Sequence, residues 1–253
     1  MNTALLETIN RTCEASVFYG APAQEVVSTG LPQLDAIMGG GIPLGRIVEV
    51  YGGEESGKTA LALHMAQRLP GPILYVDADH GLSPYILQGA EDMYLLNVDT
   101  LETALDACFT AVVGGFGSIV IDTVTALPTN ENMRIGINDR KCKIGENQAK
   151  IMSKALPILA PFLHKTGCTL ILVNQMREKP SVMIGNPERP TGGKAVGYYS
   201  ALRLETHRYE TIKHANTTTG QKILVKVEKC KYAAPGKRAV VSLIYGEGVN
   251  MDG

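Results

Sequence analysis

One stretch in the first quarter of the chain decides its fold: Gly52-Gly53-Glu54-Glu55-Ser56-Gly57-Lys58-Thr59. It matches the phosphate-loop pattern, which is a glycine, four variable residues and then Gly-Lys-Thr. The apolar run 46–51 before it predicts a short buried strand, and residues 60–67 after it predict a helix. Backbone N–H groups that are free at a helix N-terminus point at an anion, and the helix dipole favours negative charge there. The stretch therefore predicts a site for the phosphates of a nucleotide.

All eight residues of this phosphate loop are candidate cofactor-binding residues, and ATP with Mg²⁺ is the expected cofactor. The Lys58 ammonium can reach the β- and γ-phosphates, and the Thr59 hydroxyl is a ligand for Mg²⁺. The alternative is a glycine-rich turn that matches by chance, which happens in on the order of one chain per hundred of this length. The strand and helix that flank the loop favour the nucleotide site.

Size and composition limit the class of protein. The chain has 253 residues, of which 45% are hydrophobic, enough for one large α/β domain. No apolar run approaches the ~18 residues of a membrane span, and the N-terminus lacks the pattern of a secretory signal. Five scattered cysteines without a C-x-x-C pair favour a reducing compartment over disulfides or zinc. We expect a cytoplasmic protein with no membrane partner.

The net charge of −1 hides a strong asymmetry between the two halves of the chain. Residues 1–133 hold 4 Lys/Arg and 16 Asp/Glu, whereas residues 134–253 hold 20 Lys/Arg and 9 Asp/Glu. The first half therefore carries −12 and the second half +11. A basic half of this size suggests contact with a polyanion. The alternative is that the two halves neutralise each other, within one subunit or between neighbours.

Periodicity predicts the order of the elements. An amphipathic helix at 3–18 packs either on its own core or on another subunit, and a brief strand follows at 25–29. Further helices are expected within 31–44, at 100–113 and at 148–163, the last one interrupted by Pro157 and Pro161. Strands are expected at 72–77, 93–97, 118–123, 169–175, 202–206, 223–228 and 240–245. Residues 130–145 and 176–194 are predicted to be loops.

Short apolar strands that alternate with helices predict an α/β fold with a mainly parallel, doubly wound sheet. The last three strands are expected to be antiparallel, because no helices connect them. In doubly wound sheets ligands bind at the carboxyl ends of the strands. The phosphate loop and several polar residues all fall at such ends, which predicts a single active site.

Four polar residues at the predicted strand ends are candidates for the chemistry. Asp122 closes a strand downstream of the phosphate loop, where it can hold Mg²⁺ through water; the alternative is a carboxylate that caps a loop. Asp79 can orient or deprotonate a water aimed at the γ-phosphate, and Asp77 competes for this role. Gln175 can sense the γ-phosphate and reorder the segment that follows it; the alternative is a polar strand cap.

The segment 176–194 is longer than most connections, and loops of this length are commonly functional. It combines basic side chains, glycines and the apolar pair Met183-Ile184. Basic side chains bind phosphates, glycines allow a close backbone approach, and apolar side chains can insert between bases. A nucleic-acid contact is one interpretation, and a mobile surface loop is the other.

Several stretches share their pattern with one known family: 45–51, the phosphate loop, 76–80, 120–127, 174–177, 182–188, 191–193 and 245–248. On these stretches the chain resembles bacterial RecA-type recombinases over roughly residues 28–250. The stretch Val182-Met183-Ile184-Gly185-Asn186-Pro187-Glu188 is far more specific than the phosphate loop, because it distinguishes recombinases from other ATPases with a similar fold. The resemblance implies the RecA-like ATPase fold, with antiparallel strands at its C-terminal end.

The resemblance also implies a function. It implies a DNA-dependent ATPase that forms a helical filament on single-stranded DNA and pairs it with a homologous double-stranded DNA. ATP would lie between subunits, and Lys229 and Lys231 match two catalytic lysines that the neighbour contributes. Residues 1–27 would be an oligomerisation helix and strand, and residues 28–253 the ATPase core.

Two loops of the core, near 130–147 and 176–194, would grip the DNA. The candidate DNA-binding residues are Arg140, Lys141, Lys143, Ser153, Met176, Arg177, Lys179, Met183, Ile184, Asn186, Thr191, Gly192, Gly193 and Lys194.

Some positions depart from the family pattern. The family's catalytic glutamate is matched by Asp79, which is one methylene shorter, so we expect slow ATP turnover. Ile86 stands where the family has a tyrosine that stacks on adenine, and the adjacent Tyr85 is the candidate for that contact. Pro180 replaces an aliphatic residue that separates base triplets. The chain stops at Gly253, without the family's C-terminal lobe, which suggests a phage-encoded or other short form, or a shortened protein.

Two functions of other classes compete with the recombinase. One is a protein that coats or anneals single-stranded DNA and uses ATP as an assembly signal. The other is a ring-forming DNA translocase with a similar core. The stretch Gly185-Asn186-Pro187-Glu188 argues against the translocase.

Overall fold

The computed structural model describes residues 23–82, 92–135, 144–178, 188–190, 193–215 and 217–250. The side chains of Arg177, Glu178, Glu188–Pro190 and Asn250 are outside this description. The helix predicted at 3–18 also lies outside the described residues. All statements below concern the described part of the chain.

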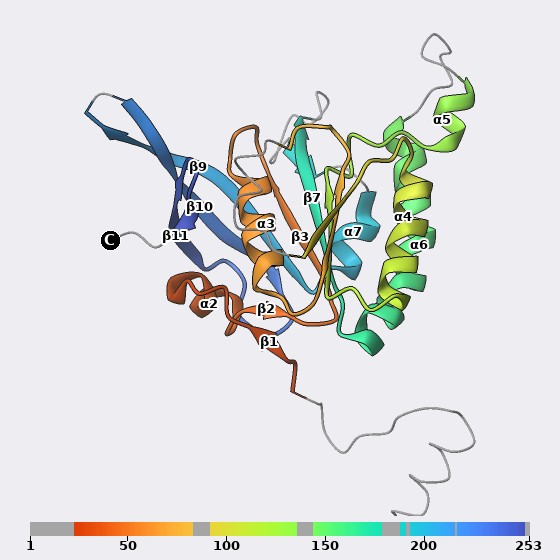
Figure 1. Cartoon of the computed structure of the whole chain (residues 1–253), viewed down its shortest axis with the longest axis horizontal. Coiled ribbons are helices and arrows are strands. Elements are labelled where there is room, and N and C mark those ends of the chain that lie inside the picture. Colours follow the sequence, from red (N-terminus) through yellow and green to blue (C-terminus); the bar gives the residue numbers. More distant parts are fainter. Residues whose placement is uncertain are drawn as a thin grey trace, which may run out of the picture.

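A ten-stranded sheet forms the centre of the described chain, in the order β12-β11-β10-β9-β3-β7-β6-β4-β5, with β8 paired to β7 (Figure 1). Strands β5, β4, β6, β7, β3 and β9 are parallel neighbours, whereas β9 to β12 pair antiparallel. This confirms the predicted parallel sheet with antiparallel C-terminal strands. The strands are β3 (Ile47–Gly52), β4 (Ile73–Asp77), β5 (Met93–Leu96), β6 (Ser118–Asp122), β7 (Thr169–Glu178), β8 (Glu188–Pro190), β9 (Leu202–His214), β10 (Thr217–Cys230), β11 (Arg238–Ile244) and β12 (Gly248–Asn250).

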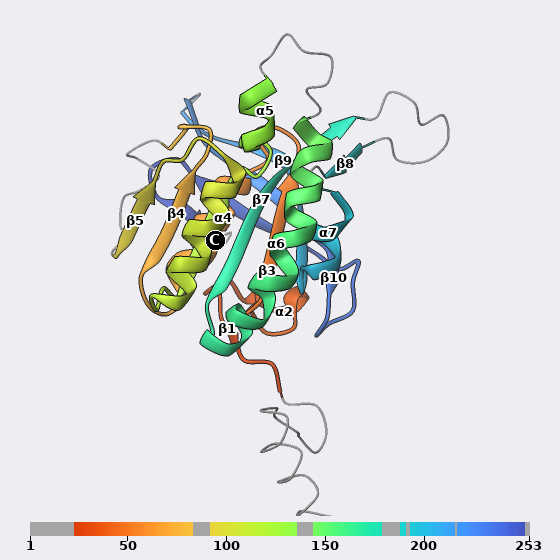
Figure 2. The same cartoon turned by 90° about the vertical axis from the view of Figure 1, so that its right-hand side faces the viewer.

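Helices cover both faces of the sheet, as Figures 1 and 2 show. The helices α2 (Pro32–Met38) and α3 (Lys58–Arg68) pack on one face. The helices α4 (Leu101–Val113), α6 (Ile144–Thr166) and α7 (Gly193–Tyr199) pack on the other. A small antiparallel pair, β1 (Val26–Val27) and β2 (Ile42–Pro43), lies beside α2. The short helix α5 (Asn130–Ile135) lies beyond the upper ends of α4 and α6 in Figure 1.

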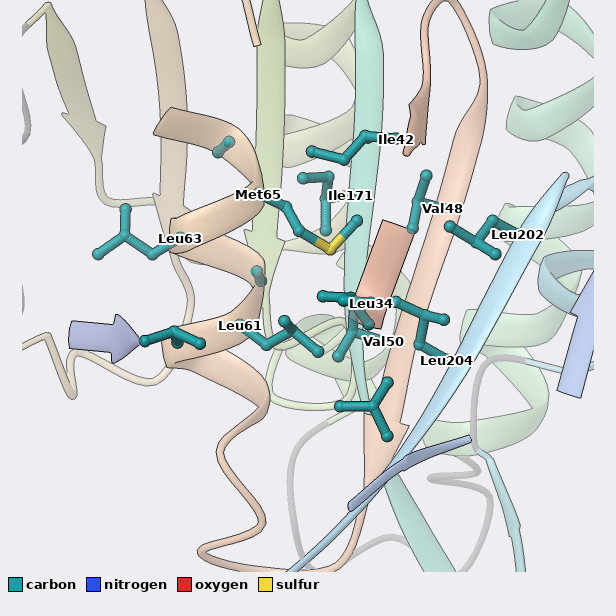
Figure 3. Packing of buried hydrophobic residues seen from close by; sticks show 14 of the residues in the cluster. Leu34, Ile42, Val48, Val50, Leu61, Leu63, Met65, Ile171, Leu202 and Leu204 are labelled. Carbon is teal, nitrogen blue, oxygen red and sulfur yellow. The ribbon is translucent and has the colours of Figure 1, made fainter. Parts of the chain in front are cut away.

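Two hydrophobic cores follow from the alternation of side chains along each strand. Val48 and Val50 of β3 face α3, whereas Ile47 of the same strand faces the opposite core. Figure 3 shows Leu61 and Met65 of α3 pointing toward Val50 and Ile171 of the sheet. Both cores are almost free of solvent, so the strands of the central sheet are held rigidly. The carboxyl ends of β3, β4, β6 and β7 are thereby fixed relative to one another.

The predicted interruption of the helix at 148–163 is wrong, because α6 is continuous through Pro157 and Pro161. The two prolines are four residues apart, so they share one face, and that face is exposed. The carbonyls that lose a helical partner therefore face water. On the other face Met152, Leu156, Leu159 and Leu163 are buried. Burial of four such side chains contributes about 2 kcal/mol each, against a cost of about 3 kcal/mol for each interior proline.

The loop predicted at 130–145 is wrong in part, because residues 130–135 form α5 and α6 begins at Ile144. The Thr129 hydroxyl accepts the Asn132 N–H at 3.3 Å, and the Asn132 side chain accepts the Thr129 N–H at 3.2 Å. This reciprocal pair is a capping box, which starts a helix. The Thr-x-x-Asn spacing was visible in the sequence.

The loop predicted at 176–194 is also shorter than expected. Strand β7 continues to Glu178, β8 pairs with it antiparallel, and α7 begins at Gly193. Strands β9 and β10 likewise extend beyond the predicted 202–206 and 223–228, as a hairpin that projects from the core (Figure 1). Within the described chain no helix is both long and apolar enough to cross a membrane.

Candidate functional site

The phosphate loop connects the end of β3 to the start of α3 and packs tightly against β9 and β10. A Cβ on Gly52 would lie 2.3 Å from the Thr206 carbonyl oxygen, so only glycine fits there. Gly57 has φ +81°, and a Cβ there would lie 2.9 Å from Ile223. Side chains are strained at such a φ, and glycine is not. Gly52 and Gly57 therefore have packing reasons, besides the role toward phosphate that the motif predicts. By contrast, a Cβ on Gly53 would meet nothing within 4 Å.

Side chains from β9 and β10 hold the loop in place. The Ser56 hydroxyl donates to the Gly53 carbonyl at 2.9 Å and shares a hydrogen bond of 2.8 Å with the Thr206 hydroxyl. The Gln221 amide donates to the Glu55 carbonyl at 3.0 Å, and Arg208 pairs with the exposed Glu55 carboxylate at 3.0 Å. These contacts from β9 and β10 were not predicted from the sequence, since no local pattern reveals a partner about 150 positions away.

Lys58 turns back into the loop. Its Nζ donates to the Gly53 carbonyl at 2.5 Å, and the side chain is largely buried. Burial lowers the pKa of Lys58, while the carboxylates of Asp122 and Glu54 raise it in part. The ammonium thus has one main-chain acceptor inside the loop, and phosphate oxygens are the stronger acceptors that this position suits.

Asp122 is the centre of a group of three oxygen side chains. Its Oδ2 accepts hydrogen bonds from Thr59 Oγ1 at 2.6 Å and from the Tyr75 hydroxyl at 2.7 Å. Burial raises the pKa of Asp122, and the two hydrogen bonds lower it in part. Tyr75 was missed, although a buried tyrosine hydroxyl needs a partner and its strand ends beside that of Asp122.

The residues present fit a magnesium ion. Asp122 Oδ1 is buried and has no hydrogen-bond partner in the described chain. Mg²⁺ is held by hard oxygen ligands, usually one or two carboxylates together with water and phosphate oxygens. The described residues contain no cluster of three or more His, Cys, Asp or Glu side chains that could hold a metal. Thr59 and Asp122 therefore suit an ion that arrives with a nucleotide.

The two acids after β4 have different surroundings. Asp77 is buried, and its carboxylate accepts the N–H groups of Gly81 at 3.2 Å and Leu82 at 3.3 Å. Asp79 is exposed, and its Oδ1 accepts the Gly81 N–H at 3.1 Å. Asp77 thus supports the turn after β4, whereas the carboxylate of Asp79 remains open to solvent. The role of Asp79 toward water stays a prediction.

Gln175 lies beside the phosphate loop, because Gly52 and Gln175 are register partners in the parallel pair β3 and β7. Its backbone N–H donates to the Asn174 side-chain oxygen at 3.0 Å. The Asn174 amide in turn donates to Glu49 at 3.0 Å. The backbone of β7 is therefore fixed at the residue where it passes the candidate γ-phosphate position.

Glu49 is a fully buried carboxylate directly behind the phosphate loop. Besides Asn174 it binds Arg203 of β9, with Nε and Oε2 2.5 Å apart. The Arg203 guanidinium also lies over the ring of Tyr51, 4.9 Å from its centroid. Although burial opposes its charge, the carboxylate of Glu49 raises the pKa of Arg203. The ion pair joins β3 to β9, and the Asn174 hydrogen bond joins β3 to β7. Neither contact was predicted from the sequence.

Lys229 and Lys231 do not join the phosphate loop of their own chain. Lys229 is paired in register with Arg203, which lies three residues before Thr206, the β9 residue that pairs with Gly52. Its Nζ donates to the carbonyls of Gly197 at 2.8 Å and Tyr198 at 2.9 Å, at the end of α7. Burial lowers the pKa of Lys229, and the nearby Lys231 lowers it further. A role toward a neighbouring subunit stays a prediction.

Few of the candidate DNA-binding residues are described. Ser153 is exposed on α6, where its hydroxyl donates to the Ala149 carbonyl at 2.7 Å. Met176 is half-buried in β7, and Gly193 and Lys194 are exposed at the start of α7. The others lie outside the described side chains: Arg140, Lys141, Lys143, Arg177, Lys179, Met183, Ile184, Asn186, Thr191 and Gly192. Tyr85, the candidate for adenine stacking, lies outside them too.

The chain is similar to known proteins in sequence and in fold. The family model described as the RecA N-terminal domain matches residues 17–250. The chain belongs to the RecA family. This RecA-family chain is 38% identical over 243 residues to Protein RecA of Clostridium perfringens (strain 13), covering 92% of the chain and 68% of that protein. It is 41% identical over 238 residues to Protein RecA of Saccharopolyspora erythraea, covering 90% of the chain and 68% of that protein.

A solved structure shares the fold of this RecA-family chain. The crystal structure of the RadB recombinase superposes with a TM-score of 0.66 and covers 90% of the chain and 100% of its own length. Its sequence identity is 21%, so the match concerns the fold alone. The resemblance to RecA-type recombinases and the RecA-like fold are both confirmed.

Proposed function

We propose that the protein is an ATP-dependent DNA recombinase that assembles on single-stranded DNA and pairs it with a homologous duplex. One observation carries the proposal: Gly52 of the phosphate loop and Gln175 of β7 are register partners. Strand β7 leads into the segment 176–194, which holds most of the candidate DNA-binding residues. On this proposal the nucleotide site and the DNA site would be neighbours at the carboxyl edge of the sheet. Family membership and the relatives named Protein RecA support the same function.

The nucleotide would be held at the carboxyl edge of the sheet. Backbone N–H groups of the phosphate loop and the Lys58 ammonium would bind the phosphates. Thr59 and Asp122 would hold Mg²⁺, which when bound neutralises charge on the phosphate oxygens. The Gln175 amide can both donate and accept, so it can distinguish a γ-phosphate from water. Each of these roles is a proposal for the side chain in the position described above.

ATP would act chiefly as a switch, with slow hydrolysis. The side chain of Asp79 is one methylene shorter than the family's glutamate, and its carboxylate binds the N–H of its own turn. A base that is held back from the attacking water loses much of its effect, because small misplacements weaken catalysis strongly. We therefore propose a DNA-dependent ATPase in which binding of ATP sets the affinity for DNA.

The DNA would contact the basic second half of the chain, through segments near 130–147 and 176–194. Subunits would form a helical filament, with residues 1–27 on the adjacent core and with Lys229 and Lys231 reaching the neighbour's nucleotide. Phosphate contacts dominate such binding, so the affinity for single-stranded DNA falls steeply with salt. We also propose that the protein is located in the cytoplasm.

A strand-invasion assay tests the proposal. The full chain is incubated with single-stranded DNA, then with a homologous supercoiled duplex, in the presence of ATP or a slowly hydrolysed analogue. A recombinase yields joint molecules with both nucleotides, and a non-homologous duplex as control yields none. No joint molecules with either nucleotide, although the protein binds the single strand, would refute the recombinase.

Asp79 is exposed, and its carboxylate binds the N–H of its own turn, which is consistent with slow ATP hydrolysis. Slow hydrolysis also favours a second candidate, a protein that coats or anneals single-stranded DNA. Such a protein binds DNA in an ATP-dependent way and gives no joint molecules. A ring-forming translocase would instead unwind duplex DNA with ATP and fail to do so with the analogue. The same assay therefore distinguishes all three functions.

A further inference from the structure

The start of α6 lies where three functional parts of the chain meet. Helix α6 begins at Ile144, within the first candidate DNA segment. Its second turn contacts the backbone that follows Asp122, and the same turn touches the first residue of α7, which ends the second candidate DNA segment. Figure 2 shows α7 beside α6. A displacement of the start of α6 or of the start of α7 therefore reaches this turn of the helix.

Gln148 makes the contact to the segment after Asp122. Its side chain is 2% exposed, and Nε2 lies 2.6 Å from the Leu127 carbonyl and 3.3 Å from the carbonyls of Val124 and Thr125. Only the NH₂ end of the amide suits three carbonyl oxygens, because an oxygen in that position would be repelled by all of them. The amide thus fixes the segment 124–127 to α6 over its whole length.

The segment 124–127 passes this constraint to the nucleotide site. The Val124 N–H donates to the Val173 carbonyl of β7 at 3.1 Å, two residues before Gln175. Val124 also stands two residues after Asp122. Gln148 is therefore one hydrogen bond and two residues away from Asp122, the candidate magnesium ligand. It is two hydrogen bonds away from β7, the strand that carries the candidate γ-phosphate sensor Gln175.

The neighbouring residue Ala149 makes the contact to α7. A Cβ added to Gly193 would lie 2.7 Å from the Ala149 Cβ, so the two helices approach as closely as glycine allows. Gly193 has φ +80°, which a side chain would strain. The start of α7 therefore cannot move toward α6 without moving it. Packed interiors transmit such shifts because they do not compress.

We propose that Gln148 is a positioning residue that couples DNA binding to the magnesium and γ-phosphate side of the nucleotide site. The inference rests on the proposed function, because it takes the two DNA segments and the ATP site from it. DNA bound at the ends of α6 and α7 sets the position of α6. Gln148 then sets the position of the backbone 124–127, and thereby the positions of Asp122 and of β7 at Val173. Removal of the Gln148 amide leaves the nucleotide site and the DNA site intact but abolishes the coupling between them.

The test measures coupling in both directions. The affinity for a fluorescent ATP analogue in Mg²⁺ is measured with and without oligo-dT, and the affinity for oligo-dT is measured with and without the analogue. The ratio of the two affinities is the coupling factor, and by linkage it must be the same in both directions. Gln148→Met keeps the length of the side chain and removes the donors. Gln67→Met, at an exposed position of α3, is the matched control.

We expect Gln148→Met to lower the coupling factor at least fivefold in both directions, since allosteric coupling is typically 5-fold to 150-fold. The affinity for the analogue without DNA stays within about twofold of wild type, as does the affinity for DNA without nucleotide. Gln67→Met keeps the full coupling factor. Global destabilisation lowers all affinities together and does not produce this pattern.

An unchanged coupling factor in Gln148→Met would overturn the inference. A loss of nucleotide affinity in the absence of DNA would overturn it too, because Gln148 would then only support the site. If Gln148→Met does not fold, Gln148→Asn replaces it, since the shorter amide keeps the polarity and loses reach to the Leu127 carbonyl. If wild type itself shows no coupling, the proposed function fails and not this inference alone.

Discussion

The Thr59 hydroxyl and the Asp122 carboxylate are 2.6 Å apart although 63 residues separate them in the chain. Thr59 stands at the start of α3, and Asp122 ends β6, which is two strands away from β3 in the sheet. The pair brings one hydroxyl oxygen and one carboxylate oxygen together. Next to them is Asp122 Oδ1, which has no hydrogen-bond partner in the described chain. The hydroxyl and the carboxylate are both hard oxygen groups of the kind that bind Mg²⁺, so Thr59 and Asp122 remain the candidate magnesium ligands.

Thr59→Val should weaken binding of a magnesium nucleotide. The change removes the hydroxyl ligand and the hydrogen bond to Asp122, and hydrogen bonds to charged groups are worth about 1.5–3 kcal/mol, or roughly 10-fold to 100-fold in affinity. Titration with a fluorescent ATP analogue in Mg²⁺ measures the effect. Thr59→Ser keeps the hydroxyl and serves as the control. Wild-type affinity in Thr59→Val would exclude Thr59 as a ligand.

Lys58→Ala should abolish nucleotide-dependent assembly on single-stranded DNA. The ammonium is held 2.5 Å from the Gly53 carbonyl, inside the loop that would surround the phosphates. Electron microscopy of mixtures with ATP and oligo-dT detects the filaments. If filaments form with ATP as in wild type, the phosphate loop does not control assembly.

Asp79→Glu should raise the rate of ATP hydrolysis about 10-fold to 100-fold, because a misplacement near 1 Å can cost about 100-fold. The longer side chain brings the carboxylate to the reach that the family's glutamate has. Phosphate release in the presence of single-stranded DNA measures the rate. Asp77→Glu is the matched control, since Asp77 accepts the N–H groups of Gly81 and Leu82. No change, or a fall, in Asp79→Glu would move the role to Asp77.

Arg203→Met should destabilise the fold by about 3 kcal/mol, because it leaves the fully buried Glu49 carboxylate without its cation. Urea unfolding measures the free energy. The pair of half-buried Lys222 and exposed Glu210, 3.4 Å apart, provides the comparison. Glu210→Ala should cost at most about 1 kcal/mol. Equal costs for the two substitutions would mean that burial of Glu49 has no energetic consequence.

His64 should make the stability depend on pH. Its Nε2 contacts the Thr29 carbonyl at 2.8 Å, and burial lowers its pKa; the nearby Arg68 lowers it further, while the Thr29 hydrogen bond and the Asp35 carboxylate raise it in part. The unfolded chain then binds a proton more readily than the folded one, so stability is lost as pH falls from about 6.5 toward the lower folded pKa.

His64→Gln should lose less stability over this range, because its amide donates to the same carbonyl and does not titrate. Urea midpoints at pH 7.5 and 5.5 measure the difference, and carboxylates that titrate in both proteins cancel in the comparison. An identical loss in the two proteins would show that His64 charges as readily in the folded chain as in the unfolded one.

Local sequence determined the parts of this protein that depend on neighbouring residues. The phosphate loop, the buried strands and the placement of Asp122 at a strand end follow from motif spacing and from periodicity, which act over a few residues. Gln175 was predicted at a strand end as well, but β7 continues to Glu178. The capping box at Thr129 and Asn132 belongs to this group as well, although the loop prediction passed over it. The parallel sheet followed from the alternation of strands and helices.

The tertiary structure decided everything that depends on which strands are neighbours. Tyr75 and Asp122, and Glu49 and Arg203, meet because of strand order and register, across 47 and 154 residues of chain. Gln148 and Leu127 meet across 21 residues because α6 packs against the segment that follows β6. Burial against the sheet likewise keeps α6 continuous through two prolines. The sequence could name the candidate nucleotide-binding residues, whereas the hydrogen bonds that position them are made by residues distant in the chain. The packing energy of the folded chain selects those partners. The conformational preferences of neighbouring residues do not depend on partners so far away in the chain.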